Sequence, residues 1–409
     1  MHTTLPPEPA SRDGRGVLAL LSPGQGAQAP GMLVPWLDLP LAAARLRWLS
    51  EVSGLDLIRL GTAAEAEEIR DTSVTQPLLV ATALAAAAEL ELPVASTDLV
   101  TAGHSVGELV AASLAGVFSP EAAVVLARVR GREMAAACAL SPTGMSAVLG
   151  GDPDEVVAGI EALGLTPANR NGAGQVVAAG AVEALAKLAA APPGGAKVRA
   201  LTVAGAFHTT YMEPARDAFG ALAAGVPAAD PHLMLLSNAD GTAVDSGAEV
   251  VQRMVGQLTR PVRWDLCQTT LRHLGVSAII ELPPAGTLAG MARRELPGVE
   301  TVKLRTPDDL PAARALVARA AAGGQGEHTP DWRVVIAPAG GTFAAGEVAV
   351  GTRVSAGSKL GAVRTKKEDL QVSAGYDGIL VEWLLQDGDL VDPGEPLARL
   401  VPGAGEETR

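Results

Sequence analysis

One short stretch of the chain combines a candidate nucleophile with the turn that would expose it. Residues 98–102 form an apolar run typical of a buried parallel strand, and residues 106–116 form an apolar helix rich in Ala and Leu. Between them, residues 103–107 read Gly-His-Ser-Val-Gly, a G-x-S-x-G motif. The two glycines permit a sharp strand-to-helix turn, which would expose Ser105 at a helix N-terminus, where free N–H groups favour developing negative charge. We predict that Ser105 is a nucleophile; a plain turn of small residues is the alternative.

A serine nucleophile needs a general base, and the chain has six histidines. His208 follows a predicted Val-rich strand at 198–203 and begins a small, hydroxyl-rich turn, so it is the best candidate. His104 is the neighbour of Ser105, but successive side chains in a tight turn diverge, and we expect it to point away. The remaining histidines lie in a leader, a linker, a strand and a helix: His2, His328, His232 and His273.

A Gly-rich loop and an arginine cluster each allow two interpretations. Residues 22–28 form a Gly-rich loop after a first strand at 16–21, without the residues of a nucleotide-binding loop. One interpretation is that the loop turns the backbone N–H of Gln25 toward an active site. The other is that the loop is a plain strand-to-helix turn. The predicted helix at 121–139 carries an arginine cluster that is either a solvated face or the source of one side chain for a site. The cluster consists of Arg128, Arg130 and Arg132.

Composition excludes several functions. The net charge of -13 over 409 residues disfavours nucleic acid and anionic membranes as partners. Two cysteines, Cys138 and Cys267, exclude a disulfide framework and a cysteine metal site, and we predict no metal. The longest apolar stretch, 77–88, is too short to span a bilayer. Residues 1–15 lack the apolar segment of a signal peptide and are predicted to be a disordered leader, so we predict a soluble cytoplasmic protein.

The order of predicted elements places one subdomain inside an α/β core. Residues 143–203 read as β-α-β-α-β, with 167–169 as a candidate extra strand, which is the pattern of a ferredoxin-like fold. The flanking segments 16–142 and 204–304 supply the core. A helix and a Gly-rich linker occupy 305–330.

The C-terminal region repeats itself. Six residues recur 37 positions later: Ala337, Gly341, Gly351, Val354, Gly357 and Leu360 recur as Ala374, Gly378, Gly388, Val391, Gly394 and Leu397. Two copies of a short all-β unit, related by an approximate two-fold axis, therefore form one domain over 331–402, followed by a tail at 403–409. A charged hairpin at 364–369 joins the two halves.

Six motifs occur in order between residues 16 and 304. They are Gly24-Gln-Gly-Ala-Gln28, Thr75-Gln-Pro77, Gly103-His-Ser-Val-Gly-Glu108, Arg130-Gly131, Phe207-His208 and Gln257-Leu-x-x-Pro261. In order and spacing this series resembles that of malonyl-CoA:acyl carrier protein transacylases and of polyketide synthase acyltransferase domains. The resemblance implies an α/β-hydrolase-like core with a ferredoxin-like inserted subdomain. It also implies transfer of malonyl from malonyl-CoA to the phosphopantetheine thiol of an acyl carrier protein, in fatty acid or polyketide biosynthesis, with no cofactor required.

The resemblance assigns the catalytic roles residue by residue. Ser105 would carry the malonyl group as an ester, and His208 would act as general base and then acid. The backbone N–H groups of Gln25 and Val106 would form the oxyanion hole. Gln257 would orient the histidine, replacing the acid of a hydrolase triad.

The resemblance also assigns substrate selection. Arg130 would pair with the malonyl carboxylate through two parallel hydrogen bonds. Phe207 matches the aromatic residue that malonyl-selecting polyketide domains carry before the histidine. Gly205 departs from the family pattern, which often has His there, so the resemblance supports malonyl binding more than exclusion of methylmalonyl.

Residues 332–401 resemble biotinyl/lipoyl carrier (hammerhead) domains, whose hairpin between the halves bears a modified lysine. Alignment places Lys367 at that position. Its neighbours Lys366 and Glu368 differ from the flanking Met of biotinyl domains and from the Asp and Ala of lipoyl domains. A bare lysine on a docking or spacer domain is therefore favoured over one that carries biotin or lipoate.

Three alternative functions stand beside malonyl transfer. The first is a serine thioesterase or hydrolase, disfavoured by Arg130, by the Gln25 loop and by the lack of an obvious acid partner for His208. The second is a non-catalytic scaffold, which the combination of nucleophile, base and arginine disfavours. The third is an acyltransferase subunit of a malonate decarboxylase or carboxylase system with a biotin-type carrier domain.

Overall fold

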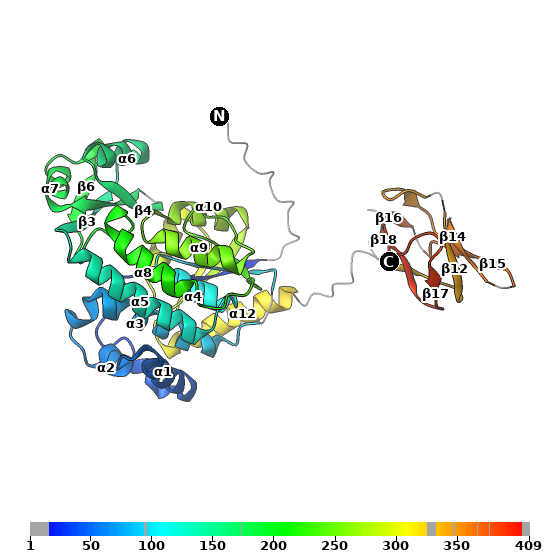
Figure 1. The fold of residues 1–409 in the computed structure, drawn as a ribbon, viewed down its shortest axis with the longest axis horizontal. Coiled ribbons are helices and arrows are strands. Elements are labelled where there is room, and N and C mark those ends of the chain that lie inside the picture. Colours follow the sequence, from blue (N-terminus) through cyan, green and yellow to red (C-terminus); the bar gives the residue numbers. More distant parts are fainter. Residues whose placement is uncertain are drawn as a thin grey trace. The chain divides into compact units, whose positions relative to one another are not determined.

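The computed structural model describes residues 16–93, 96–172, 174–324, 333–346, 348–365, 367–375 and 377–402. The chain divides into two compact units, Met1–Gly324 and Gln325–Arg409, which we describe separately (Figure 1). The predicted leader at 1–15, residues 325–330 of the predicted linker, the first two residues of the predicted C-terminal domain and the tail at 403–409 lie outside the described residues.

A five-stranded parallel sheet organises the first unit. Its order is β10 (Glu300–Lys303), β9 (Val276–Glu281), β1 (Val17–Ser22), β2 (Leu99–Gly103) and β7 (Met234–Leu235). Every residue of β1 and β2 is buried, because helices cover both faces and the strands are apolar on both. Since Ser22 pairs with Gly103, the loops that follow β1 and β2 leave the sheet side by side at its carboxyl edge.

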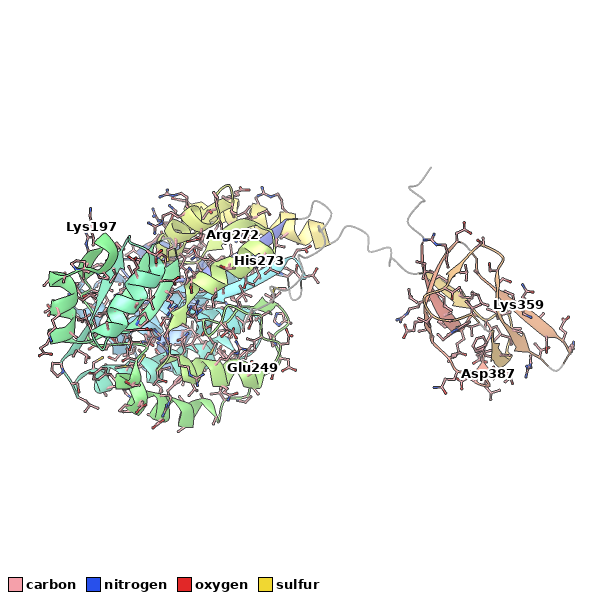
Figure 2. All side chains as sticks on the ribbon, turned by 90° about the horizontal axis from the view of Figure 1, so that it is seen from above. Lys197, Glu249, Arg272, His273, Lys359 and Asp387 are labelled. Atoms are coloured by element: carbon pink, nitrogen blue, oxygen red, sulfur yellow. The ribbon has the colours of Figure 1, made fainter. Side chains whose placement is uncertain are left out.

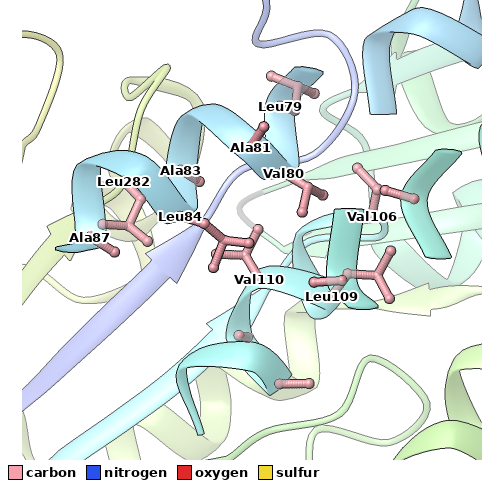
Figure 3. Packing of buried hydrophobic residues seen from close by; sticks show 14 of the residues in the cluster. Leu79, Val80, Ala81, Ala83, Leu84, Ala87, Val106, Leu109, Val110 and Leu282 are labelled. Atoms are coloured by element: carbon pink, nitrogen blue, oxygen red, sulfur yellow. The ribbon is translucent and has the colours of Figure 1, made fainter. Parts of the chain in front are cut away.

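The described core has ten α-helices, some of which pack on the sheet and others on neighbouring helices. They are α1 (Pro40–Ser53), α2 (Leu57–Thr62), α3 (Thr72–Ala87), α4 (Gly107–Leu114), α5 (Pro120–Cys138), α8 (Glu213–Ala223), α9 (Gly247–Gln257), α10 (Trp264–His273), α11 (Thr287–Glu295) and α12 (Leu310–Gly324). Figure 3 shows α3 packing with the segment that follows the Ser105 turn: Leu79, Val80 and Leu84 share one apolar cluster with Val106, Leu109 and Val110.

Helix α3 corrects one argument from the sequence. With the short turn that follows it, the helical segment Thr72–Leu90 has 19 residues and a mean hydropathy of 1.3, so by length and composition it could cross a membrane. This segment is longer than the apolar stretch 77–88, which the sequence analysis judged too short to span a bilayer. Its apolar window is 83% buried inside the protein, which is the property of a core helix. Burial, rather than shortness, therefore accounts for its apolar composition.

The inserted subdomain has its own sheet and two helices. The sheet order is β6 (Lys197–Ala200), β3 (Thr143–Leu149), β5 (Gln175–Ala181), β4 (Thr166–Gly172) and β8 (Val262–Arg263). Helices α6 (Pro153–Ala162) and α7 (Val182–Ala190) complete a β-α-β-β-α-β order. The extra strand suggested at 167–169 exists and is longer, spanning all of β4. The predicted fold class, α/β with a ferredoxin-like insertion, is confirmed.

The sequence analysis did not foresee β8. Helix α9 ends at Gln257 and α10 begins at Trp264, with a helix break at Arg260-Pro261 between them. In the structure the break continues into a two-residue strand that pairs in parallel with β4, Asn169 opposite Val262. Pro261 cannot continue the helical hydrogen bonding, and the residue before a proline is biased toward an extended conformation. The interruption thus joins the core to the edge of the inserted sheet.

The second unit consists of two four-stranded antiparallel sheets. One has the order β11 (Arg333–Ile336), β18 (Pro396–Pro402), β16 (Gly378–Trp383) and β13 (Arg353–Val354). The other has the order β15 (Asp369–Ser373), β14 (Lys359–Arg364), β12 (Gly341–Ala345) and β17 (Leu390–Val391).

The predicted two-fold repeat is present in these sheets. The strands β15, β16, β17 and β18 begin 36 or 37 residues after β11, β12, β13 and β14, so the repeat exchanges the two sheets. Lys367 lies in the turn between β14 and β15 and is exposed. The Thr365 N–H donates to the Glu368 carbonyl at 3.0 Å across this turn.

Candidate active site

Ser105 sits at the tip of a sterically tight turn between β2 and α4. A Cβ on Gly103 would lie 2.0 Å from the Gly107 carbonyl, and a Cβ on Gly107 would lie 2.2 Å from the Ser22 oxygen. Only glycine fits at these two positions. Ser105 itself has φ of +53°, a conformation that L-residues rarely adopt. Asn238 holds it there, since its Oδ1 accepts from the Ser105 N–H at 2.8 Å.

The predicted base lies against the nucleophile. His208 Nε2 is 2.8 Å from Ser105 Oγ, and its Nδ1 is 2.8 Å from the backbone carbonyl of Gln257. Because that carbonyl only accepts, Nδ1 carries the proton and Nε2 is free to accept one from the serine. The partner of Nδ1 is thus a neutral carbonyl, where a hydrolase triad has a carboxylate.

The surroundings of His208 keep its ring neutral. The side chain is buried, and desolvation followed by the positive charge of Arg130 lowers its pKa to about 3. The hydrogen bond to Gln257 opposes this shift without reversing it. A neutral imidazole is the form that can accept a proton from a serine.

The structure decides between the two interpretations of the arginine cluster. Arg130 is only 2% exposed and points into the site, where Nη2 donates to Gln257 Oε1 at 2.8 Å and lies 3.3 Å from Ser105 Oγ. Its Nη1 donates to Gln76 Oε1 at 2.8 Å. Burial lowers the pKa of Arg130 to about 10, so it stays charged at neutral pH.

The flanking arginines have other surroundings. Arg128 donates to the Ser73 carbonyl at 3.0 Å, and Arg132 pairs with Glu133 at 2.7 Å with a side chain that is 62% exposed. The cluster therefore supplies one side chain to the site.

A cavity of about 210 Å³ opens beside Ser105 and His208, between the core and the inserted sheet. Met145, Val177 and Phe207 give it an apolar wall, and Asn169 and Asn171 of β4 lie on its lining as well. Gln25 also lines this cavity, which favours the active-site interpretation of the Gly-rich loop over a plain turn.

The departure from the family pattern at Gly205 has a local cause. Gly205 is not among the residues that line the cavity, and a Cβ there would lie 2.5 Å from Cys138 Sγ. Position 205 faces the last residue of α5, and the closeness of Cys138 leaves no room for a side chain there.

The other three histidines of the described residues do not contact the serine oxygen. His104 Nε2 is 2.9 Å from Asn171 Oδ1, so its ring is directed at the inserted sheet, and its pKa is lowered by burial. His232 and His273 are exposed, and Figure 2 shows His273 beside Arg272 on the outside of the first unit. Across the described residues, no group of three or more His, Cys, Asp or Glu side chains is placed to hold a metal.

The structure therefore gathers most of the predicted residues. Ser105, His208, Arg130 and Gln257 are in hydrogen-bond contact, and Val106 immediately precedes the first residue of α4. The sequence analysis gave no role to three buried polar residues of this network: Gln76 and Glu108, which lie within two of the quoted motifs, and Asn238, which lies in none. The sequence feature that could have identified them is a polar residue in an apolar setting. Gln76 and Glu108 lie inside apolar helices, and Asn238 follows a short strand.

A positive-φ serine at the carboxyl edge of a parallel sheet, with a histidine on its oxygen, defines an α/β protein built for acyl transfer to serine. The family model for the acyl transferase domain matches residues 20–306, and this chain belongs to that family. The model for the family described as biotin-requiring enzyme matches residues 333–400.

Relatives and solved structures agree. The chain is 57% identical over 296 residues to the malonyl CoA-acyl carrier protein transacylase of Mycobacterium tuberculosis, covering 72% of this chain and 98% of the relative. The crystal structure of MCAT from Mycobacterium tuberculosis is similar with a TM-score of 0.71 and 55% identity, over 73% of this chain and 99% of that one. A malonyl-transacylase in complex with a type II PKS acyl-carrier protein matches with a TM-score of 0.68 and 28% identity, over 74% and 100%.

The surroundings of His208 predict that its ring does not titrate in the physiological range. With a pKa lowered to about 3, the proton on Nε2 is already lost well below neutrality. We expect its imidazole ¹⁵N shifts to stay constant between about pH 5 and pH 8, where a reference peptide histidine titrates near pH 6.5. The variant His208→Gln identifies the signal. A midpoint for His208 inside this window would contradict the prediction.

Proposed function

We propose that the first unit moves a malonyl group from malonyl-CoA to the phosphopantetheine thiol of an acyl carrier protein, through an ester on Ser105. The observation that carries this proposal is the buried Arg130 guanidinium, 3.3 Å from the nucleophilic oxygen and bonded to the neutral amide oxygens of Gln76 and Gln257. A buried cation beside the nucleophile suits an acyl group that ends in a carboxylate. The names of the relatives support the same substrate pair. We place the reaction in the cytoplasm, as the composition predicted.

The first half-reaction loads the serine. His208 Nε2 accepts the proton of Ser105 Oγ as the oxygen attacks the thioester carbonyl of malonyl-CoA. The N–H groups of Gln25 and Val106 would receive the oxyanion of the tetrahedral intermediate. The C–S bond then breaks, His208 returns the proton to the departing CoA sulfur, and the malonyl group remains as an ester on Ser105.

The second half-reaction transfers the malonyl group from Ser105 to the carrier protein by the same steps in reverse. The thiol of the carrier protein gives its proton to His208 and attacks the ester carbonyl. The C–O bond to Ser105 breaks, and His208 protonates the serine oxygen. Fatty acid and polyketide biosynthesis both use this step, and the proposal covers both.

Transfer is favoured over the alternative of hydrolysis by two features of the site. The Nδ1 partner of His208 is the Gln257 carbonyl, which lacks the charge of the triad carboxylate. Arg130 is placed for a free carboxylate on the acyl group, a feature that a general thioesterase does not need.

The ester on Ser105 is directly testable. Incubation with malonyl-CoA should add one malonyl group to the intact protein, and peptide mapping should place it on Ser105. Ser105→Ala should abolish labelling, because the reacting oxygen is removed. The matched variant Ser113→Ala, on the same helix α4, should label normally. Labelling that persists in Ser105→Ala would overturn the assignment.

Substrate selection by Arg130 is tested by comparing two acyl groups. Arg130→Ala should lower kcat/KM for malonyl transfer by roughly 10²- to 10⁴-fold, the loss of two charge-assisted hydrogen bonds of about 1.5–3 kcal/mol each. Acetyl transfer should fall far less, since acetyl has no carboxylate to pair. Arg128→Ala, two residues away on α5, serves as control and should leave both rates near wild type. Equal losses for malonyl and acetyl would show that Arg130 only supports the fold.

We further propose that Lys367 is bare and that the second unit is a docking or spacer domain. The transfer described above uses no cofactor. Lys367 is exposed in the β14–β15 turn, which a modifying enzyme could reach, but Glu368 follows it and differs from the residue that such enzymes prefer. The match to the biotin-requiring enzyme family supports the fold of this unit and leaves the modification to experiment.

The state of Lys367 can be measured by intact mass on protein purified from its native host. We expect the mass of the unmodified sequence and no binding to streptavidin. Lys367→Ala should transfer malonyl at the wild-type rate, as should Lys359→Ala on the neighbouring strand β14, labelled in Figure 2. A biotin or lipoyl mass that disappears in Lys367→Ala and persists in Lys359→Ala would contradict the proposal.

A further inference from the structure

Glu108 is a buried carboxylate that no step of the proposed reaction uses. It is the second residue of α4, three positions after the nucleophile, and only 4% exposed. Both of its oxygens accept hydrogen bonds: Oε1 from the backbone N–H of Asn238, and Oε2 from Gln257 Nε2 at 2.5 Å. Desolvation raises the pKa of Glu108 to about 7, against the effects of the Asn238 N–H and the charge of Arg130. Burying a charged carboxylate costs desolvation free energy, so its presence here indicates a structural or functional role.

One set of contacts runs from Glu108 to the cation of the site. The Gln257 side-chain amide has one donor group and one acceptor oxygen. Because Nε2 donates to Glu108, Oε1 is turned to Arg130, which donates to it through Nη2 at 2.8 Å. If the amide were rotated by half a turn, its NH₂ group would face the guanidinium, donor against donor. Nε2 also contacts the Ser105 carbonyl and Asn238 Oδ1, each at the longer distance of 3.3 Å. The carboxylate of Glu108 is thus the nearest of three acceptors that select the amide orientation that holds Arg130.

A second set of contacts runs to the nucleophile turn. The Glu108 side chain accepts from the backbone N–H of Asn238, whose own side chain contacts the turn at two points. Asn238 Oδ1 accepts from the Ser105 N–H at 2.8 Å, and Nδ2 donates to the Gly103 carbonyl at 2.8 Å. These two bonds hold the chain on both sides of His104, directly before the positive-φ serine.

We propose that Glu108 is a positioning residue for acyl transfer, which orients Arg130 through Gln257 and the Ser105 turn through Asn238. Glu108 touches neither the reacting atoms nor the acyl group. It couples the residue that selects the carboxylate to the residue that forms the ester, so that both keep one geometry. This inference rests on the proposed malonyl transfer.

The test compares malonyl and acetyl transfer by Glu108→Gln at about pH 8, above the pKa of Glu108, where the wild-type carboxylate predominates. Glutamine keeps the shape but replaces one acceptor by a donor, so either Asn238 or Gln257 loses its partner. We expect kcat/KM for malonyl to fall by roughly 10- to 100-fold, the effect of one buried charge-assisted hydrogen bond, and the malonyl-to-acetyl ratio to fall by about tenfold. Partial unfolding lowers both rates alike and leaves this ratio unchanged. An unchanged ratio would therefore overturn the proposal.

Three further variants make the result specific. Glu108→Asp keeps only acceptors on a shorter side chain, and its ratio should fall in the same direction but less, which also decides the question if Glu108→Gln does not fold. In an Arg130→Ala background, Glu108→Gln should no longer change the ratio, because the effect passes through Arg130. Glu89→Gln is the matched control: Glu89 is also buried and accepts a backbone N–H, from Ala42 at 3.0 Å, outside the site, and its ratio should equal that of the wild type.

The failure of this inference is distinguishable from failure of the proposed function. If wild-type protein does not form the malonyl ester on Ser105, malonyl transfer itself is wrong. If the ester forms and the ratio is insensitive to Glu108, only the positioning role is wrong.

Discussion

The active site depends on the steric closeness of two neighbouring parallel strands at their carboxyl ends. Strand β1 delivers Ser22 and strand β2 delivers Gly103 in register, and the first turn of α4 packs so close to Ser22 that residue 107 has no room for a Cβ. This crowding forces the chain through a positive-φ conformation at Ser105. The nucleophile is therefore presented by the backbone, and the loop that carries Gln25 emerges next to it.

The chemistry of the site depends on a cation and a base that share a dry environment. Neutral amide oxygens of Gln76 and Gln257 bind Arg130 in place of water. The negative charge of Glu108 opposes the lowering of its pKa by burial, so Arg130 keeps its charge. The same charge, added to desolvation, keeps His208 neutral and ready to accept a proton. Gln257 serves both residues, its backbone carbonyl binding the imidazole and its side chain binding the guanidinium. Base and cation are thus held by one residue at the end of α9.

Much of this protein followed from local sequence. Alternation and apolar runs predicted the elements, the order of elements predicted the ferredoxin-like insertion, and the repeat in the C-terminal region predicted two matching halves, because each of these patterns is written within tens of residues. Ser105 was identifiable because its turn is local, and His208 because few histidines were available. Gln25, Arg130 and Gln257 came from resemblance of motifs, since no periodicity shows which way a side chain on a buried helix points.

Tertiary structure decided the rest. Whether Arg130 meets water or the nucleophile depends on how α5 packs against α3, and the sequence of α5 alone fits both outcomes. Glu108 is 130 residues from Asn238 and 149 residues from Gln257 along the chain. Only the parallel pairing of β2 with β7 brings Asn238 beside the Ser105 turn. Strand β8 likewise exists only because the edge of β4 is available to it. The sequence by itself determined which local structures form and which residue types are present for chemistry. Hydrogen-bond partners far apart in the chain were fixed by tertiary packing, because a buried polar group takes whichever partner the packing places within reach.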